Sequence, residues 1–286
     1  MRFTYAKLFL ISFINLSLYG QYFDTISIPK KINFVNHLRQ NKQIDDACYL
    51  LNYFNSQVQI DSLKLMEVKL LLELRREKDA DSLLQSCANL FPDSSSLKCS
   101  YILLKNHARL LNGKYDEITD PRCPDHLSHR EIWRLQLLSA AILKNKTNDF
   151  EMVFNSGKCY HPNLSLIELS MYDQNIQLKE RRKKSGFVAG MLSAILPGSG
   201  KIYASKPREA LTGFLPVAFN LVQAGEGYYY KKFESPHLYI FGSISTAFYA
   251  SGIYGSVRAA NRKNTEFKDK IKANVEFEIT KLIVYY

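Results

Sequence analysis

Residues 181–263 read RRKKSGFVAGMLSAILPGSGKIYASKPREALTGFLPVAFNLVQAGEGYYYKKFESPHLYIFGSISTAFYASGIYGSVRAANRK, with basic clusters at both ends. Three uncharged segments lie between the clusters, at residues 186–196, 210–225 and 237–257. About 20 apolar residues in a helix cross the hydrocarbon core of a bilayer, so the last segment is long enough. The alternative is a buried helix of a soluble domain, although such helices rarely run this far without a charge. The stretch therefore predicts a small helical membrane domain with two or three apolar segments.

Small residues recur every four positions in the last of these segments. Small residues let the backbone of another helix approach closely, so we expect this face to pack on a neighbouring helix. The same face could also join the membrane helices of several copies into an oligomer. Tyr228, Tyr229 and Tyr230 beside Lys231 and Lys232 are typical of the aromatic belt at a membrane surface. The small residues of the predicted packing face are Ser243, Ala247, Ser251 and Gly255.

The first apolar segment ends in the run LPGSGKIY, residues 196–203. Proline removes a backbone donor and glycine frees the chain to turn, so a half-helix, a re-entrant segment and a kinked span all stay open. The run is not a phosphate-binding loop, because Ile195 stands where the first glycine of that motif is needed and Ile202 where its hydroxyl is needed.

The same run resembles bacterial envelope proteins of the domain-of-unknown-function 5683 type. It is similar, more loosely, to the two-transmembrane-segment family, whose mark is Pro-Gly-x-Gly-Gln-x-Tyr. In this chain Lys201 stands in place of the glutamine of that motif, and Ser205 stands where a glycine is usual. The resemblance implies a membrane hairpin in the envelope of a bacterium, often behind a signal peptide and helical repeats, and it implies no reaction. It rests on Pro197, Gly198, Gly200, Lys201 and Tyr203.

The N-terminus has the features of a targeting segment. Residues 1–20 carry Arg2 and Lys7, then an apolar run, then a small residue, which predicts a secretory signal peptide. A signal anchor that stays on the chain is the alternative. We therefore expect the following domain outside the cytoplasm.

Residues 21–180 predict helices throughout. Polar turns at residues 41–42, 77–78, 112–114 and 145–146 are each followed by acidic residues, which favour the start of a helix. A period of about 34 residues made of two helices is typical of tetratricopeptide repeats. The sequence thus predicts an all-α chain with a tetratricopeptide-like helical-repeat domain, whose concave face would bind a peptide or protein.

The net charge of +11 is unevenly distributed. Residues 21–180 hold 20 Lys and Arg against 20 Asp and Glu, whereas residues 181–286 hold 16 against 7. Basic clusters beside apolar segments favour anionic lipids, and no basic face with interleaved aromatics indicates nucleic acid. Residues 264–286 form a basic tail whose alternating apolar residues predict a strand or an amphipathic interfacial segment.

The five cysteines leave at least one thiol unpaired. Cys48 and Cys87 lie among apolar residues spaced three and four apart, so we expect them in the core as free thiols. Cys123 and Cys159 lie in loop-like stretches and are the pair for which we predict a disulfide first. A zinc site is a weak alternative, because two prolines interrupt one half of the cluster and neither half has a common finger spacing. We therefore expect no metal, no cofactor and no catalytic group. The weak metal candidates are Cys123, His126, His129, Cys159 and His161.

The expected function is that of a membrane-anchored, exported scaffold that recruits a protein partner in envelope assembly or maintenance. The expected organisation is a signal peptide at 1–20, a repeat domain at 21–180, a membrane hairpin at 181–263 and a tail at 264–286. One alternative is a transport or insertion component that uses the Pro197–Gly200 break. Another is an exported metal-binding enzyme.

Overall fold

The computed structural model describes residues 27–57, 61–91, 96–120 and 127–285. All regular secondary structure in these ranges is helical, which confirms the predicted all-α class. The predicted signal peptide at 1–20 lies outside the described residues. The chain divides into two compact units. The first takes the described residues up to Lys144, together with Asn148–Leu169 and the residues from Glu278 onward; the second takes Asn145–Thr147 and Ser170–Phe277.

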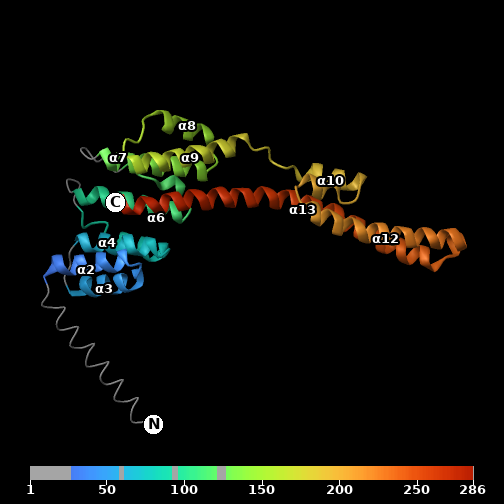
Figure 1. The fold of residues 1–286 in the computed structure, drawn as a ribbon, viewed down its shortest axis with the longest axis horizontal. Coiled ribbons are helices and arrows are strands. Elements are labelled where there is room, and N and C mark those ends of the chain that lie inside the picture. The colour runs from blue at the N-terminus through green and yellow to red at the C-terminus, as the bar shows by residue number, and fades with distance from the viewer. Residues whose placement is uncertain (1–26, 58–60, 92–95, 121–126, 286) are drawn as a thin grey trace, which may run out of the picture. The chain divides into compact units, whose positions relative to one another are not determined.

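Short helices joined by tight turns build the first unit (Figure 1). Several of these turns contain a residue in the left-handed conformation, at Lys42, Arg75 and Gly113. After Lys42, the N–H of Gln43 donates to the carbonyl of Leu38 at 2.9 Å, which closes the end of the preceding helix. The helices are α2 (Ile28–Gln40), α3 (Ile44–Gln57), α4 (Asp61–Glu73), α5 (Glu77–Ser86), α6 (Ser96–Leu111), the short η1 (Tyr115–Glu117), α7 (Leu127–Leu143), α8 (Thr147–Asn155) and the start of α9 (Pro162–Glu180).

One of the predicted turns is wrong by a few residues. Glu77 and Lys78 lie in the first turn of α5, and the turn itself precedes them at residues 74–76. Acidic residues are favourable in a first helical turn because they oppose the helix dipole, so Glu77 and Asp79 begin α5 and do not interrupt it.

The core of the first unit follows the predicted apolar stripes. Spacings of three and four residues place these side chains on one face of each helix, where neighbouring helices bury them. Cys48 and Cys87 are buried free thiols, as expected. Other predicted stripe residues that are buried are Val35, Leu38, Ala47, Leu51, Phe54, Leu63, Leu70, Ala80 and Leu84. Four residues predicted on the same stripes are not fully buried: Phe34 is exposed, and Leu50, Met66 and Leu83 are partly buried.

The second unit contains the end of α9 and the helices that follow it. In this unit α10 packs on α11, and α11 packs on α12. Its small core consists of alanines on several helices with Tyr203 packed beside them. The helices are α10 (Gly186–Ile195), α11 (Ser199–Tyr203), α12 (Pro207–Lys231), the short η2 (Lys232–Glu234) and most of α13 (Pro236–Lys281).

No helix in the described part of the chain is both long enough and apolar enough to cross a membrane. The segment 237–257, predicted to span, does lie within the long helix α13. Serine, glycine and tyrosine are frequent in it, and they lower its mean hydropathy although it contains no charged residue.

The tail contains no strand within its described residues. Helix α13 continues to Lys281, and the helical turn η3 (Leu282–Tyr285) follows it. Ile271, Val275 and Ile279 are buried, whereas Phe277 is exposed. The period of this segment is therefore four and not two, so the strand alternative was wrong.

Candidate functional site

The Pro197–Tyr203 run turns the chain back on itself between α10 and α11. Gly198 has a left-handed backbone (φ +88°), and a β-carbon there would lie 2.8 Å from the carbonyl oxygen of Ala210. At Gly200 an added β-carbon would lie 1.9 Å from the carbonyl oxygen of Ala189. Both glycines are thus needed for the close approach of backbones.

Hydroxyl groups hold this turn in place. The N–H of Gly200 donates to Ser193 Oγ at 3.0 Å, and Ser193 Oγ donates to Ser256 Oγ on α13 at 2.7 Å. The N–H of Ser185 donates to the Tyr203 hydroxyl at 3.2 Å. Because Ser185 precedes α10 and Tyr203 ends α11, the chain returns to the level at which it entered. The structure thus shows a hairpin of two short helices at this run, and its placement in a membrane as a half-helix, a re-entrant segment or a kinked span stays a prediction.

Lys201 lies in a slot between α12 and α13. Its Nζ donates to the carbonyl of Glu209 at 3.2 Å. An added β-carbon on Gly213 would lie 2.9 Å from Lys201 Nζ, and one on Gly255 would lie 3.4 Å from Lys201 Cε. Two glycines on two helices therefore make room for the lysine that replaces the glutamine of the resembling family.

The predicted packing face of α13 differs from the face used within the chain. Ser243, Ala247 and Ser251 are exposed, whereas Gly255 is partly buried against Lys201. The buried serines are Ser245, which donates to the carbonyl of Val217 at 3.2 Å, and Ser256. The face that packs is set by hydrogen bonds to particular partners, which spacing alone does not reveal.

Large apolar side chains cover the outside of the second unit. Ile195 is 80% exposed, Phe187 75% and Phe219 63%. Monomeric soluble proteins seldom expose large contiguous apolar patches, and those that do use them for membranes or partners. Further exposed apolar residues are Leu211, Leu215 and Val222 on α12 and Ile240, Ile244 and Phe248 on α13.

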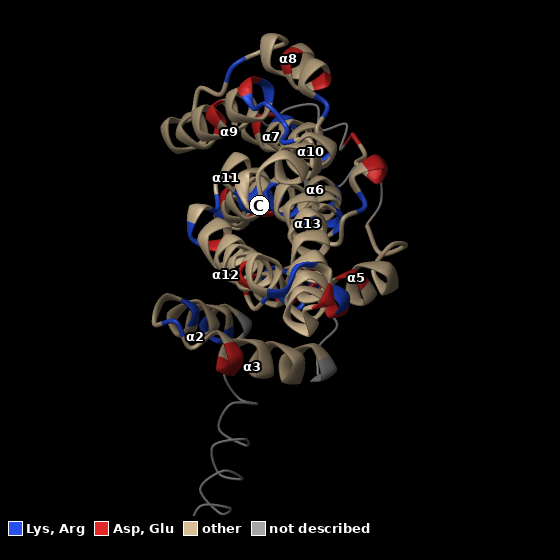
Figure 2. Cartoon of the chain, turned by 90° about the vertical axis from the view of Figure 1, so that its right-hand side faces the viewer, with Lys and Arg blue, Asp and Glu red and all other residues tan. Residues whose placement is uncertain are grey.

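Basic residues border this apolar surface at both ends, and tyrosines border it at one end. Figure 2 colours the lysine and arginine positions of the described chain blue. At one end Tyr229 and Tyr230 are exposed beside Lys231 and Lys232, close to the start of α13. At the other end, Lys206 pairs with Glu266 at 3.2 Å, and the basic segment before α10 contacts α13 through Asn264. The basic residues of this second end are Arg181, Arg182, Lys183, Lys184, Arg258, Arg262 and Lys263.

The weak metal candidates do not form a ligand group among the described residues. Cys123 and His126 lie outside those residues. Cys159 is a free thiol, so the predicted bridge between Cys123 and Cys159 was wrong. Burial, with Glu168 nearby, raises the pKa of Cys159 to about 12, which opposes the thiolate that zinc requires. The ring of His161 lies edge-on to Tyr285 at 5.3 Å, and His129 lies near the start of α7.

A buried polar cluster, not anticipated from the sequence, fixes the loop before α9. Arg134 on α7 forms an ion pair with Glu168 on α9, and both side chains are buried. Arg134 also donates to the carbonyl of Phe154 at 2.7 Å, and the Glu168 carboxylate accepts from the N–H of Cys159 at 3.0 Å. The signal in the sequence was a charged residue close to apolar residues on each helix, Ile132 and Leu135 on α7 and Leu164 and Ile167 on α9. The cluster satisfies every one of these groups and is structural.

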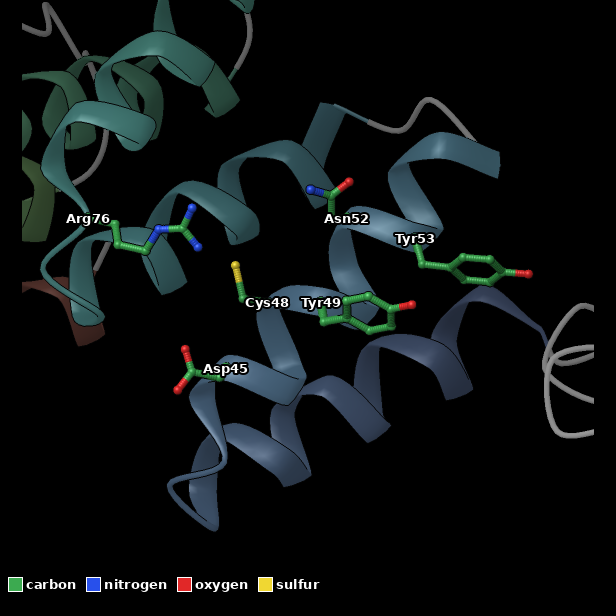
Figure 3. Close-up of a pocket in the computed structure, with 6 residues that line it drawn as sticks. All are labelled: Asp45, Cys48, Tyr49, Asn52, Tyr53 and Arg76. Atoms are coloured by element: carbon green, nitrogen blue, oxygen red, sulfur yellow. The ribbon is translucent and has the colours of Figure 1, made fainter. Parts of the chain in front are cut away.

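Two further surface features lie on the first unit. A surface pocket of about 470 Å³ on α3 brings Tyr49, Tyr53 and Cys48 together with the opposite charges of Asp45 and Arg76 (Figure 3). The C-terminal turn η3 packs on α4 and α7, and its residues Leu282 and Ile283 are buried.

No protein-family model, no curated protein and no solved structure matches this chain. The resemblance to the domain-of-unknown-function 5683 type therefore stays a prediction carried by the Pro197–Tyr203 run.

Proposed function

We propose that the chain is a membrane-attached helical scaffold of a bacterial cell envelope, which holds a partner-recruiting unit at the bilayer. The observation that carries the proposal is the exposed apolar surface of α10, α12 and the first half of α13. Lipid is the occupant we assign to this surface, because basic residues border it at both ends and tyrosines border it at one end, as they do in proteins whose apolar middle lies in hydrocarbon.

The dimensions of the second unit support this assignment. Helix α12 has 25 residues, which is roughly 37 Å at 1.5 Å per residue. A hydrocarbon core is about 30 Å thick. The surface assigned to lipid is defined by the exposed side chains. The mean hydropathy of a helix also counts polar residues that face other helices, and Ser193, Ser256 and Lys201 are such residues.

Partner recruitment is supported by the chemistry of the first unit. The first unit is built from short packed helices, and arrays of such helices of the tetratricopeptide type bind helical or extended peptides. The turn η3 illustrates the kind of ligand, because an apolar helical segment covers α4 and α7. The α3 pocket adds exposed Tyr49 and Arg76, and aromatic residues and arginine often dominate binding energy at protein interfaces.

Two features support export of the first unit. Cys99 is disulfide-bonded, and disulfides persist in oxidising compartments. Residues 1–20 have the composition of a secretory signal peptide. The alternative of a transport component would use Lys201 to line a polar path. We favour a packing role for Lys201, because it donates a hydrogen bond to the carbonyl of Glu209 and fits between two glycines.

A vesicle-flotation experiment tests attachment. The full chain should float with vesicles of pure phosphatidylcholine, whereas the Leu215→Glu, Phe219→Glu variant should lose most binding, because two charges would enter hydrocarbon. Charged residues at mid-membrane cost about 2.5–3.5 kcal/mol each on insertion scales.

The matched control is Met152→Glu with Leu169→Glu, which places the same charges on exposed apolar residues of the first unit. The control should float like the parent. Loss of flotation in both variants, or in neither, would contradict the assignment of lipid to the second unit.

A further inference from the structure

We infer that the second unit contains a binding pocket for the phosphate group of an anionic lipid headgroup, at the basic end of its apolar helices. This inference rests on the proposed membrane attachment and adds the ligand. The pocket has a volume of about 400 Å³, and all of its lining residues belong to the second unit. They are Asn145, Thr147, Leu178, Lys179, Arg181, Lys183, Asn264, Phe267 and Lys268.

The charge of the pocket is strongly positive. Lys179, Arg181, Lys183 and Lys268 line it, and no described lining residue is acidic. Among the described residues, no carboxylate forms an ion pair with Arg181, Lys183 or Lys268. Lysine and arginine beside a phosphate make charge-assisted hydrogen bonds, so a phosphodiester supplies the missing negative charge.

The pocket is held in shape by contacts that do not use its lysines. The Arg181 guanidinium lies 3.7 Å above the centre of the Phe267 ring and donates to the carbonyl of Lys263 at 2.8 Å. Asn264 accepts from the N–H of Lys184 at 3.0 Å and donates to its carbonyl at 2.7 Å. The basic segment before α10 is thereby fixed to α13, and Lys183 and Lys268 project beside a preformed arginine.

The position of the pocket favours a lipid over a soluble phosphate ester. Lys184 is followed directly by Ser185 and α10, whose residues Phe187 and Met191 are exposed and apolar. Leu178 and Phe267 give the pocket apolar walls beside its cations. A headgroup bound here would have its acyl chains beside the apolar surface assigned to lipid, so one molecule would satisfy both features.

Titration of the full chain with vesicles tests the inference. The parent should bind vesicles of phosphatidylcholine with a minor fraction of phosphatidylglycerol more tightly than vesicles of phosphatidylcholine alone. In Lys183→Gln, Lys268→Gln this gain should fall by about 25-fold, since one lysine near an anionic membrane contributes about fivefold. Binding to pure phosphatidylcholine should not change.

Two control variants separate the pocket from general charge. Lys270→Gln, Lys272→Gln removes the same charge from exposed positions of α13 outside the pocket, and it should keep most of the gain. Lys183→Arg, Lys268→Arg keeps the charge and should bind like the parent. Circular dichroism should show equal helix content for all variants, because Lys183 and Lys268 make no ion pair among the described residues and Lys272 makes one, with Glu276 at 3.8 Å, from an exposed position.

Three results would overturn the inference. The first is an equal loss in both glutamine variants, which would mean attraction by charge without a site. The second is parent-like binding by Lys183→Gln, Lys268→Gln. The third is saturable binding of soluble glycerol phosphate without any preference for phosphatidylglycerol, which would assign the pocket to a free phosphate ester. Failure of the parent to bind pure phosphatidylcholine would instead contradict the proposed attachment.

Discussion

At the residue scale, the buried pair of Arg134 and Glu168 shows how two charges are tolerated in a helical core. Each makes further hydrogen bonds, to the carbonyl of Phe154 and from the N–H of Cys159. Removing one partner of such a pair leaves an uncompensated charge, whereas removing both does not. The loop that precedes α9 depends on this arrangement.

We predict that Glu168→Leu destabilises the first unit by about 3–5 kcal/mol, because Arg134 stays buried without its partner. Arg134→Met combined with Glu168→Leu should recover part of this loss, to be measured by guanidinium unfolding. Asp79→Ala, which breaks the exposed ion pair with Arg76 at 2.7 Å, is the control and should cost less than about 1 kcal/mol. Strictly additive effects of the two core substitutions would refute coupling between them.

At the scale of the element, the turn between α10 and α11 depends on glycines that carry out different tasks. Gly198 supplies a left-handed backbone, whereas Gly200 allows α11 to contact α10 at Ala189. Gly225 on α12 has no other atom within 4 Å of an added β-carbon. The chain therefore contains a matched pair of helical glycines, one in a tight contact and one in open space.

We predict that Gly200→Ala lowers the stability of the second unit by at least about 1–3 kcal/mol, since the methyl group would overlap the Ala189 carbonyl. Gly225→Ala should be neutral or stabilising by up to about 1 kcal/mol, because alanine favours helix. Thermal unfolding in detergent, with limited proteolysis of residues 181–263, measures both. Equal melting temperatures for the two variants would show that α10 and α11 do not meet as described.

At the scale of the whole molecule, the path of the chain constrains its topology in a membrane. The residues from Glu278 onward belong to the first unit, and η3 packs on α4 and α7. Helices α10 and α11 form a hairpin, so under the proposed attachment α12 and α13 would be the elements that carry the chain into the bilayer. Because the last residues belong to the first unit, the proposed attachment requires an even number of crossings.

We predict that single cysteines at Asn112 and Val284, both exposed, react alike with a membrane-impermeant maleimide in intact cells that express a chain without native cysteines. Under the proposed export, both should be labelled before lysis. Labelling of only one would contradict the even number of crossings. Labelling of neither until lysis would place the first unit in the cytoplasm and remove the support for an envelope scaffold.

The amino-acid sequence alone was enough for the all-α class, the buried stripes, the core thiols Cys48 and Cys87 and the turn at Pro197–Gly200. These features follow from side-chain periodicity and backbone conformation, which act over a few residues. Tertiary structure was needed for the Arg134–Glu168 pair, the slot around Lys201, the packed face of α13 and the basic pocket. Each joins residues far apart in the chain, as Arg181 and Asn264 are, and their meeting depends on how whole helices pack, which local spacing does not specify.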